Sequence, residues 1–380
     1  MKSKILSIYL PQFHAIPEND EWWGTGFTEW VNVKRGRKFY PGHYQPREPL
    51  HDDYYDLSDI KVLEKHTKLA KKAGISGFCF YQYYFCGKKL LEKPIETYRD
   101  YSKADFPYCL IWANESWMRT WYRAPANNTL LMRQVYGDEN EWKEHFYYLL
   151  MFFKDKRYIK IDNKPVYIIY IPQNIRYRKE MFTLWRKLAK EEGFDGLFLI
   201  AMNTSHGKAD RSDVYDAYLN FEPMVSLFGD DISWRKHILN WKGRHINLIR
   251  KNRVSWINRV LAKNDYSYSY LCKFIEKKAK RSDKKTYSGI FSGWDNTSRK
   301  DEAGIIIRGS SPKKFGKHIL KMLRISERSD KEYIFLNAWN EWSEGAYVEP
   351  DKKYGYRYLR ALRHAVFKYN NESVTKGKEY

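Results

Sequence analysis

Signatures of several common enzyme classes are missing from this 380-residue chain. It contains no glycine-rich dinucleotide or nucleotide-phosphate loop, no His-Glu-x-x-His zinc motif and no Gly-x-Ser-x-Gly nucleophile turn. It also lacks Asp-x-Asp, the metal–diphosphate motif common in Rossmann-like nucleotide-sugar transferases. These absences argue against dehydrogenases, P-loop NTPases, zinc peptidases and serine hydrolases that carry those motifs, and they leave metal-independent transferases open.

Cysteine and long apolar runs are also scarce. The four cysteines show neither a Cys-x-x-Cys pair nor metal-ligand spacing, so we expect reduced thiols and no metal or other cofactor. The first apolar run, 5–10, is ended by Pro11 and is too short for a signal-peptide core, and no later run approaches membrane-spanning length. The sequence therefore predicts a cytoplasmic enzyme or binding protein.

Acidic residues are few in one segment of a chain that is basic overall. The formal net charge is +22, and segment 234–285 supplies more than half of it, with 16 Lys and Arg against three acidic residues. Such a block suggests a docking face for phosphates, anionic lipid headgroups or an acidic glycan. A solvated helical insertion without a partner explains it equally well. Nucleic-acid binding would rest on charge alone, so we expect no nucleic-acid partner, whereas peripheral contact with the anionic inner face of a membrane stays open.

Apolar and aromatic residues are plentiful, at 43% and 17%, which is enough for a sizeable core. Eight short apolar runs bounded by turn signals are typical of buried parallel strands. These runs are 4–10, 74–81, 108–113, 165–171, 196–202, 214–221, 287–293 and 333–338. Helical patterns lie between or after them, at 59–73, 179–192, 311–323 and 356–369. Eight strands alternating with helices predict an α/β fold, a single (β/α)8 TIM barrel with insertions.

The links between the predicted strands are unequal. The first link is about sixty residues long and rich in Trp, Gly and His, whereas the link from the fifth strand to the sixth has only about ten residues. The basic segment interrupts the link from the sixth strand to the seventh, where we expect a basic helical insertion at about 229–285. With no convincing domain boundary, we expect one barrel domain over 1–370 and a flexible tail over 371–380.

Polar and aromatic residues gather where the predicted strands end, which is where TIM-barrel active sites form. Aromatic faces stack on the C–H surface of a sugar, while carboxylates and amides bind its hydroxyls. Turn chemistry alone accounts for the Asn and Asp residues but not for the repeated Trp and Tyr. The candidate substrate-binding residues, including Trp23 in the long first link, are Gln12, His14, Trp23, Tyr81, Tyr84, Trp112, Asn114, Glu115, Glu222, Trp294, Asp295, Trp339 and Asn340.

Two glutamates near the last predicted strand are the candidate catalytic pair. Glu341 and Glu344 lie three residues apart, one at the strand's end and one in its loop. Glycosidic cleavage needs a protonated acid beside the leaving oxygen and a carboxylate near the reacting carbon, about 5–5.5 Å apart in retaining enzymes. Close carboxyls raise one another's pKa, which keeps one of them protonated near neutral pH.

Six segments also follow one another in a characteristic order. They are YLPQFH (9–14), WGTGFTEW (23–30), GFCFY (77–81), WANE (112–115), GWDN (293–296) and NAWNEWSEG (337–345). Together they resemble the glycoside hydrolase family 99-like domain, and specifically the WbsX-type proteins of bacterial O-antigen and capsule gene clusters. The resemblance spans roughly residues 4–365.

This resemblance implies a (β/α)8 barrel and retaining chemistry, because the endo-α-mannosidases of the family cleave α-mannosidic bonds with retention. In those enzymes the first glutamate of a Glu-x-x-Glu pair is the base on the sugar's 2-hydroxyl, which gives a 1,2-anhydro sugar. The second is the general acid and then the general base. Carried over by motif, Glu341 would be the base and Glu344 the acid/base. The WbsX-type branch is commonly described as glycosyltransferase, and the hydrolase branch offers no counterpart to the basic segment.

Three functions remain open on the sequence alone. The leading hypothesis is an enzyme that cleaves or transfers a glycosidic bond in a bacterial surface polysaccharide, acting on a glycan or lipid-linked oligosaccharide. A second is a nucleotide-sugar or lipid-linked-sugar glycosyltransferase of the same pathway, with the basic segment 234–285 on diphosphate or the membrane face. A third is a non-catalytic glycan-binding module, which would not need the glutamate pair.

Overall fold

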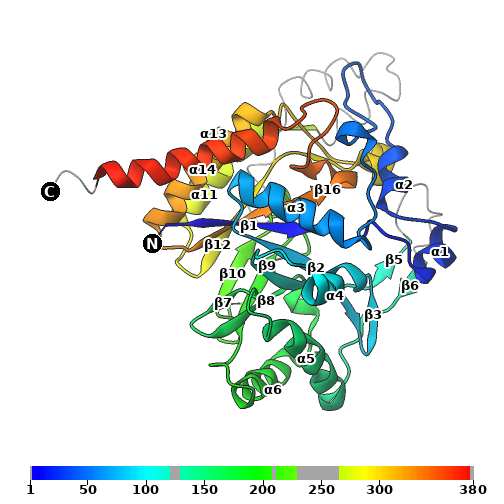
Figure 1. Cartoon of the computed structure of the whole chain (residues 1–380), viewed down its shortest axis with the longest axis vertical. Helices are drawn as coiled ribbons and strands as arrows, with labels where there is room; N and C mark the ends of the chain where they lie inside the picture. The colour runs from blue at the N-terminus through cyan, green and yellow to red at the C-terminus, as the bar shows by residue number, and fades with distance from the viewer. Residues whose placement is uncertain (1, 120–128, 208–210, 229–264, 377–380) are drawn as a thin grey trace.

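The computed structural model describes residues 2–119, 129–207, 211–228 and 265–376 (Figure 1). Its centre is a closed barrel of eight parallel strands: β1 (Lys4–Tyr9), β2 (Gly77–Phe85), β4 (Tyr108–Trp112), β8 (Lys164–Ile169), β9 (Phe198–Asn203), β10 (Ala217–Asn220), β12 (Thr286–Phe291) and β15 (Tyr333–Asn337). Strand β1 pairs in parallel with both β2 and β15, which closes the sheet. The predicted (β/α)8 barrel is confirmed, and each of the eight predicted runs overlaps one of these strands.

The barrel strands are apolar on both faces because helices cover the outside and side chains fill the inside. Strands β4 and β15 are buried at every position, which is the continuous pattern expected of parallel strands. One boundary differs from the prediction, since β2 begins at Gly77 and not at residue 74. The reason is that Gly74 ends the preceding helix in the left-handed conformation, with φ of 89°.

Long helices form the outer layer: α3 (Ile60–Ala73), α4 (Lys93–Tyr101), α5 (Glu139–Phe153), α6 (Arg178–Glu191), α11 (Tyr268–Arg281), α13 (Pro312–Arg328) and α14 (Arg357–Lys376). Start signals in the sequence explain several of them. Asp59 caps α3, Asp138 forms a capping box with Glu141 on α5, and Ser311 caps α13. In Figure 1, α14 lies along α13, while α5 and α6 cover the opposite side of the barrel.

Short elements between these helices and strands complete the described chain, many of them in the loops at the carboxyl ends of the strands. They are α1 (Pro17–Trp23), α2 (Glu29–Lys34), η1 (Leu50–Asp52), β3 (Lys88–Leu90), β5 (Trp117–Met118), β6 (Leu130–Met132), β7 (Lys160–Ile161), η2 (Pro172–Asn174), α7 (Met224–Phe228), β11 (Asp265–Ser267), β13 (Trp294–Asp295), α12 (Thr297–Lys300), η4 (Asp301–Ala303), β14 (Ile306–Arg308), β16 (Asn340–Glu341), η5 (Trp342–Glu344) and β17 (Ala346–Tyr347).

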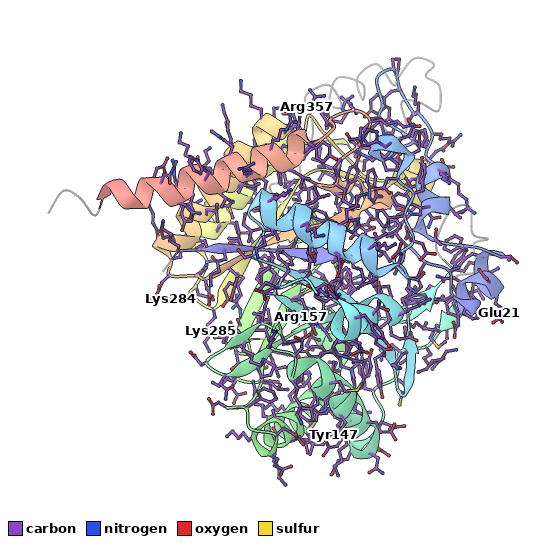
Figure 2. The ribbon with its side chains drawn as sticks, in the orientation of Figure 1. Glu21, Tyr147, Arg157, Lys284, Lys285 and Arg357 are labelled. Carbon is purple, nitrogen blue, oxygen red and sulfur yellow. The ribbon has the colours of Figure 1, made fainter. Side chains whose placement is uncertain are left out.

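The end of the basic segment belongs to the outer layer of the barrel. Strand β11 pairs with β14, and α11 packs against α13. Figure 2 shows Lys284 and Lys285 at the end of the barrel where the strands begin, on the opposite side of the molecule from Glu21. The rest of the expected insertion, residues 229–264, lies outside the described residues, so its expected docking role stays a prediction.

The last helix is longer than the sequence pattern predicted. It continues to Lys376, into the segment expected to be a flexible tail, and Glu372 pairs with Arg324 of α13 at 2.7 Å. Residues 377–380 lie outside the described residues. In the parts of the chain that are described, no helix combines the length and the apolar character needed to cross a membrane.

Candidate active site

Both candidate catalytic glutamates lie in the loop that follows the last barrel strand. After β15 the chain forms a small antiparallel pair, β16 with β17, with the 3-10 turn η5 between them. Glu341 is the last residue of β16 and Glu344 the last of η5. One tight turn, the η5 loop (residues 341–347), therefore carries both carboxylates at the carboxyl end of the barrel.

A single buried arginine connects the two glutamates. Arg299 of α12 lies 3.0 Å from Glu341 through Nη2 and 2.9 Å from Glu344 through Nη1. Its Nη2 also lies 3.0 Å from Glu29 of α2. The arginine is 8% exposed. Three carboxylates from three different elements therefore share one guanidinium, and we call these four residues the carboxylate cluster.

The carboxylate cluster contains three acidic groups and one basic group. Burial raises the pKa of Glu341 well above its ordinary value, and the charge of Glu344 adds to this, while Arg299 offsets part of it. Burial likewise raises the pKa of Glu344. Carboxyls this close titrate as a unit, so the pair retains a proton at a pH where an exposed glutamate would be ionised. A retained proton is what a general acid requires.

Glu115, after β4, lies within electrostatic reach of the cluster. Burial raises its pKa to about 7, and the charge of Glu344 adds to this effect. Its side chain is nevertheless 42% exposed, and His206 lies 4.0 Å from it. Glu115 is therefore a half-neutral carboxyl at the rim of the site, in a position to bind a hydroxyl of an entering ligand.

Tyrosines form the aromatic wall near the cluster. The ring of Tyr81 lies 6.4 Å from that of Tyr83 and 6.1 Å from that of Tyr170. Burial raises the pKa of each hydroxyl, and the charge of Glu341 adds to this in all three. Polar tips on apolar rings beside acidic groups suit a polyhydroxylated ligand.

The η5 loop is held by a buried hydrogen-bond network. Trp342 donates its indole N–H to Glu349 at 2.6 Å, and the Tyr55 hydroxyl donates to the same carboxylate at 2.8 Å. The His66 ring lies 2.9 Å from Glu349. The Trp342 ring also stacks on Tyr347, with centroids 3.8 Å apart. Packing and hydrogen bonds thus fix the turn that carries the catalytic pair before any ligand arrives.

The candidate residues from the first link reach the site to different degrees. Gln12 donates to the Tyr83 hydroxyl at 2.7 Å, which connects it to the aromatic wall. His14 is buried and its Nδ1 lies 3.0 Å from the carbonyl of Pro11. Trp23 is half-buried, stacks on Phe27, and lies under the Arg119 guanidinium. Gln12 therefore supports the wall, while His14 and Trp23 make no direct contact with the cluster in the structure.

Two candidate asparagines join neighbouring strand ends. Asn340 accepts from the backbone N–H of Leu10 at 2.8 Å and donates to the carbonyl of the same residue at 2.9 Å. Asn114 makes the same two bonds with Ile171, both at 2.8 Å. Their amides thus complete the backbone pairing where the strands stop, and both are fully buried. The structure gives them a positioning role in the barrel rim.

Three candidate aromatic residues point away from the cluster. Tyr84 stacks on His145 of α5, with centroids 3.8 Å apart. Trp112 lies 4.7 Å from the same histidine and donates to the Tyr84 carbonyl. Trp339 packs against Phe78 and His66. Successive strand side chains face opposite sides, so a strand-end position alone does not tell whether a ring faces the ligand or the helices.

The remaining candidates also lie apart from the cluster. Glu222 is buried and accepts from the backbone N–H and hydroxyl of Ser226, at 3.1 and 2.7 Å. Trp294 is buried in β13. Asp295 lies 2.7 Å from the His43 ring and lines a second cavity. The structure does not bring these three to the catalytic pair.

Two members of the carboxylate cluster were not predicted. Glu29 lies in the quoted segment 23–30 but follows no strand, and Thr28 caps the short helix that carries it. Arg299 comes four residues after Asp295, in the loop after β12. A buried cation within reach of two predicted catalytic acids has no sequence signal at this spacing, because α2, α12 and η5 meet only in the folded barrel.

Comparison with protein families and curated sequences gives a match over nearly the whole chain. A family model described as "Glycosyltransferase WbsX" matches residues 5–362. Two curated relatives from strains of Xanthomonas campestris pv. campestris, each named "Uncharacterized protein WxcX", are 30% and 31% identical to the chain. Each alignment covers 96% of this chain and 50% of the relative. The chain thus spans about half the length of the curated relatives it matches.

Solved structures share the barrel at low sequence identity. A GH99 endo-alpha-mannosidase from Bacteroides thetaiotaomicron in complex with BIS-TRIS-propane superposes with a TM-score of 0.57 at 12% identity, covering 98% of both chains. A structure described as a glycoside hydrolase-like protein gives a TM-score of 0.55 at 15% identity, covering 96% of this chain and 94% of the other. At these identities the similarity shows a shared fold.

Proposed function

Since the chain belongs to the family described as glycosyltransferase WbsX, we propose that it is a carbohydrate-active enzyme that cleaves or transfers a glycosidic bond with Glu341 and Glu344. The observation that carries this proposal is the carboxylate cluster, in which both glutamates contact Arg299 on one preorganised turn. A lectin binds hydroxyls without a pair of buried carboxyls that retain a proton. The cluster therefore favours catalysis over a non-catalytic glycan-binding module.

The exposures of the two glutamates match different roles. Glu344 has 20% of its side chain exposed and is the group that a leaving oxygen can reach, so we assign it as the acid/base. Glu341 has 9% exposed and lies deeper. Its contact with the Arg299 guanidinium favours its ionised form against the effect of burial, as a base requires. The assignment agrees with the roles implied by the family 99-like resemblance.

The proposed reaction proceeds in two steps. Glu341 takes the proton of the sugar's 2-hydroxyl, O2 bonds to C1, and Glu344 gives its proton to the oxygen that leaves C1. The resulting 1,2-anhydro sugar is then opened at C1 by water or by a sugar hydroxyl. In this second step Glu344 takes the proton of the attacking group and Glu341 returns one to O2. Both steps retain the configuration at C1 and leave the enzyme unchanged.

The choice of acceptor separates hydrolysis from transfer. A site that keeps water from the intermediate can deliver the sugar to another hydroxyl, so one set of residues supports both reactions. The resemblance to WbsX-type proteins supports a substrate from bacterial O-antigen or capsule polysaccharide, as free glycan or as lipid-linked oligosaccharide. We place the reaction at the cytoplasmic face of the membrane, with segment 234–285 as the candidate contact.

The test is an incubation of the whole chain with the surface polysaccharide of its source and with the lipid-linked precursor, followed by mass spectrometry. Carrying it out in 18O-labelled water identifies the acceptor, since hydrolysis puts one labelled oxygen into the product and transfer puts none. We expect product from the wild type and a loss of roughly 10²–10⁴-fold in turnover for Glu344→Gln.

The matched control is Glu332→Gln, at the opposite end of β15, where the glutamate pairs with Lys4 at 3.0 Å on the surface. We expect this variant to keep full turnover. A Glu344→Gln variant as active as the wild type would overturn the assigned role. Saturable glycan binding without any product would support the binding-module reading instead.

A further inference from the structure

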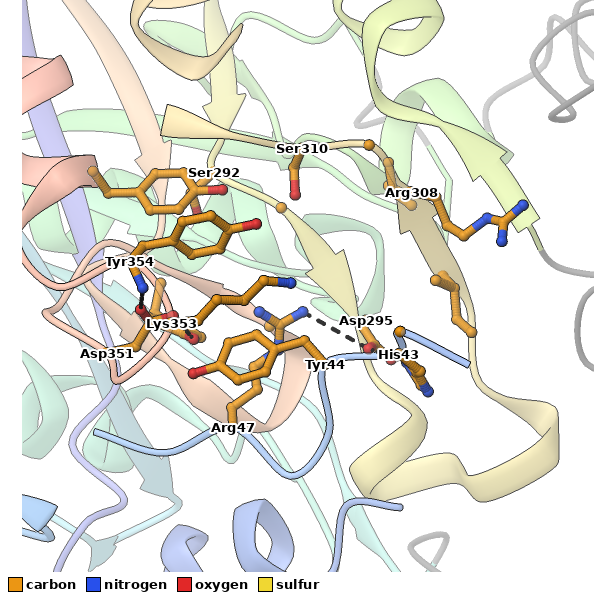
Figure 3. A pocket seen from close by; sticks show the side chains of 18 of the residues that line it. His43, Tyr44, Arg47, Ser292, Asp295, Arg308, Ser310, Asp351, Lys353 and Tyr354 are labelled. Carbon is orange, nitrogen blue, oxygen red and sulfur yellow. Dashed lines mark hydrogen bonds and ion pairs between the residues drawn. The ribbon is translucent and has the colours of Figure 1, made fainter. Parts of the chain in front are cut away.

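We propose that a second cavity, on the far side of the η5 loop from the carboxylate cluster, binds the anionic group of a charged sugar. This Arg47 cavity has a volume of about 210 Å³, and its walls include Tyr44, Arg47, Ser292, Ser310, Lys353 and Tyr354 (Figure 3). The proposal rests on the proposed function in one respect, since the ligand is taken to be a sugar.

The cations of the Arg47 cavity are less neutralised than their acidic neighbours suggest. Asp295 accepts from the Thr297 hydroxyl at 2.6 Å and lies 2.7 Å from the His43 ring, so its nearest partners are not cavity cations. Arg47 reaches Asp295 only at 3.7 Å. A long contact of this kind leaves most of the hydrogen-bonding capacity of a guanidinium unused.

The second acid of the cavity is also occupied. Asp351 accepts from the Tyr347 hydroxyl at 2.8 Å and from the backbone N–H of Tyr354. Lys353, next along the wall, makes no ion pair within the described part of the chain. Its ammonium lies 4.8 Å from the centre of the Tyr44 ring and 5.2 Å from that of Tyr354. In Figure 3 the Lys353 and Arg47 side chains both point into the cavity.

Buried polar atoms without a partner line the same cavity. The Ser292 hydroxyl, in a residue that is 2% exposed, has no hydrogen-bond partner in the structure, and neither does the Nε of Arg47. A buried donor left unpaired costs free energy, so native proteins usually satisfy it with protein, water or ligand. An anionic ligand between these groups would supply acceptors to both.

The chemistry and size of the cavity select the class of ligand. Arginine and lysine together with hydroxyls are the groups that bind phosphate and carboxylate oxygens. Tyr44 and Tyr354 present ring surfaces of the kind that stack on the C–H face of a sugar. The volume equals that of about seven liquid waters at ~30 Å³ each. This is enough for one sugar unit with its anionic group and not for a longer chain.

The position of the cavity ties it to the catalytic pair. Gly345, which directly follows Glu344, lines the cavity, and it adopts the left-handed conformation with φ of 62°. The Arg47 guanidinium packs so closely on Gly345 that an added Cβ would lie 2.8 Å from it. Tyr347 of the same wall stacks on Trp342. A charged unit bound here would therefore be held one residue from the acid/base.

Direct binding by calorimetry tests the proposal with four probes: mannose 1-phosphate, glucuronate, methyl α-mannoside and inorganic phosphate. Lys353→Gln removes an exposed cation from the wall without disturbing the core. Lys352→Gln is the matched control, since Lys352 pairs with Glu48 and Asp52 and does not line the cavity. We expect salt-sensitive, saturable binding of a charged sugar, weakened about tenfold by Lys353→Gln and unchanged by Lys352→Gln.

The arms of the experiment identify the anion and separate this proposal from the previous one. Tighter binding of mannose 1-phosphate indicates a phosphoryl-linked unit, and tighter binding of glucuronate indicates an acidic sugar in the chain. Equal binding of methyl α-mannoside, an equal loss in both lysine variants, or no saturable binding by either charged sugar would overturn the proposal. Lys353-dependent binding without polysaccharide turnover leaves it standing while the catalytic proposal fails. Turnover without charged-sugar binding does the reverse.

Discussion

The two sides of the η5 loop have opposite electrostatic character. On one side, three glutamates surround the guanidinium of Arg299 at 2.9–3.0 Å. On the other, Arg47 and Lys353 line a cavity whose acidic residues have nearer partners than these cations. Seven residues of chain separate an acid-rich site from a base-rich one. The loop therefore works as a partition between the two.

This comparison teaches that the two arginines have different tasks although both are buried. Arg299 is the minority charge of its site, and it makes an otherwise repulsive group of carboxyls compatible with burial. Arg47 belongs to the majority charge of its site and has unused donors, which suits it to an incoming anion. Removing either arginine should thus change a different property of the protein.

The largest effect that would test this contrast is expected from Arg299. Arg299→Met leaves three buried carboxyls without their cation, and we expect turnover to fall by about 10²–10³-fold. Because Arg299 lowers the pKa of Glu341 and Glu344, its loss should also move the acid limb of the pH–rate profile to higher pH. Steady-state rates from pH 4 to 9 measure both effects.

Two further variants keep this prediction interpretable. Arg299→Lys retains the charge but not the fork that reaches three carboxylates, so we expect a smaller loss and a smaller shift of the acid limb. Arg324→Met removes a surface arginine that pairs with Glu372 and should change neither. If Arg299→Met lowers the melting temperature but leaves the pH profile of its remaining activity in place, the arginine is only a structural support.

The barrel could be predicted from sequence because its signals are local. Parallel strands buried on both faces read as apolar runs, and each of the eight runs overlaps an observed strand. Helix limits were equally local, as Asp59 and Gly74 at the two ends of α3 show. The expected fold and family follow from these patterns, and the structure and the family match confirm both.

The site was less predictable because its contacts are not local. Spacing placed Glu341 and Glu344 on one turn, but nothing in the sequence relates either to Arg299 or Glu29, which come from other loops. Strand-end position also could not distinguish Trp112, which faces the helices, from Tyr81, which faces the glutamates. Alternation of side chains gives two faces, and only the closed barrel tells which one is inside.

A middle-sized effect is expected from the two asparagines that join strand ends. Asn340→Ala and Asn114→Ala each leave a buried backbone N–H and C=O unpaired, which should cost about 1–3 kcal/mol of unfolding free energy. Only Asn340 anchors the η5 loop, so its loss should weaken both turnover and charged-sugar binding. Urea unfolding measures the first effect, and the exposed Asn140→Ala, expected within 0.5 kcal/mol of wild type, is the control. Equal functional losses in both variants would contradict a role for the loop as a partition.

The smallest effect is expected from Glu115 at the rim of the acid-rich side. Its pKa of about 7, against 4.5 in an unfolded chain, means that the folded protein holds this proton more tightly than the unfolded one. Stability should therefore fall as pH rises from about 4.5 to 7, and Glu115→Gln should remove this part of the pH dependence. Unfolding free energies at pH 5, 6, 7 and 8 give the difference curve, with the exposed Glu139→Gln as control. Because Glu344 contributes to the shift, Glu115→Gln should also lower the pKa of the catalytic pair slightly. A difference curve that is flat across this range would show that the negative charge of the cluster does not extend to its rim, and the contrast between the two sides of the loop would then be confined to the residues that touch Arg299.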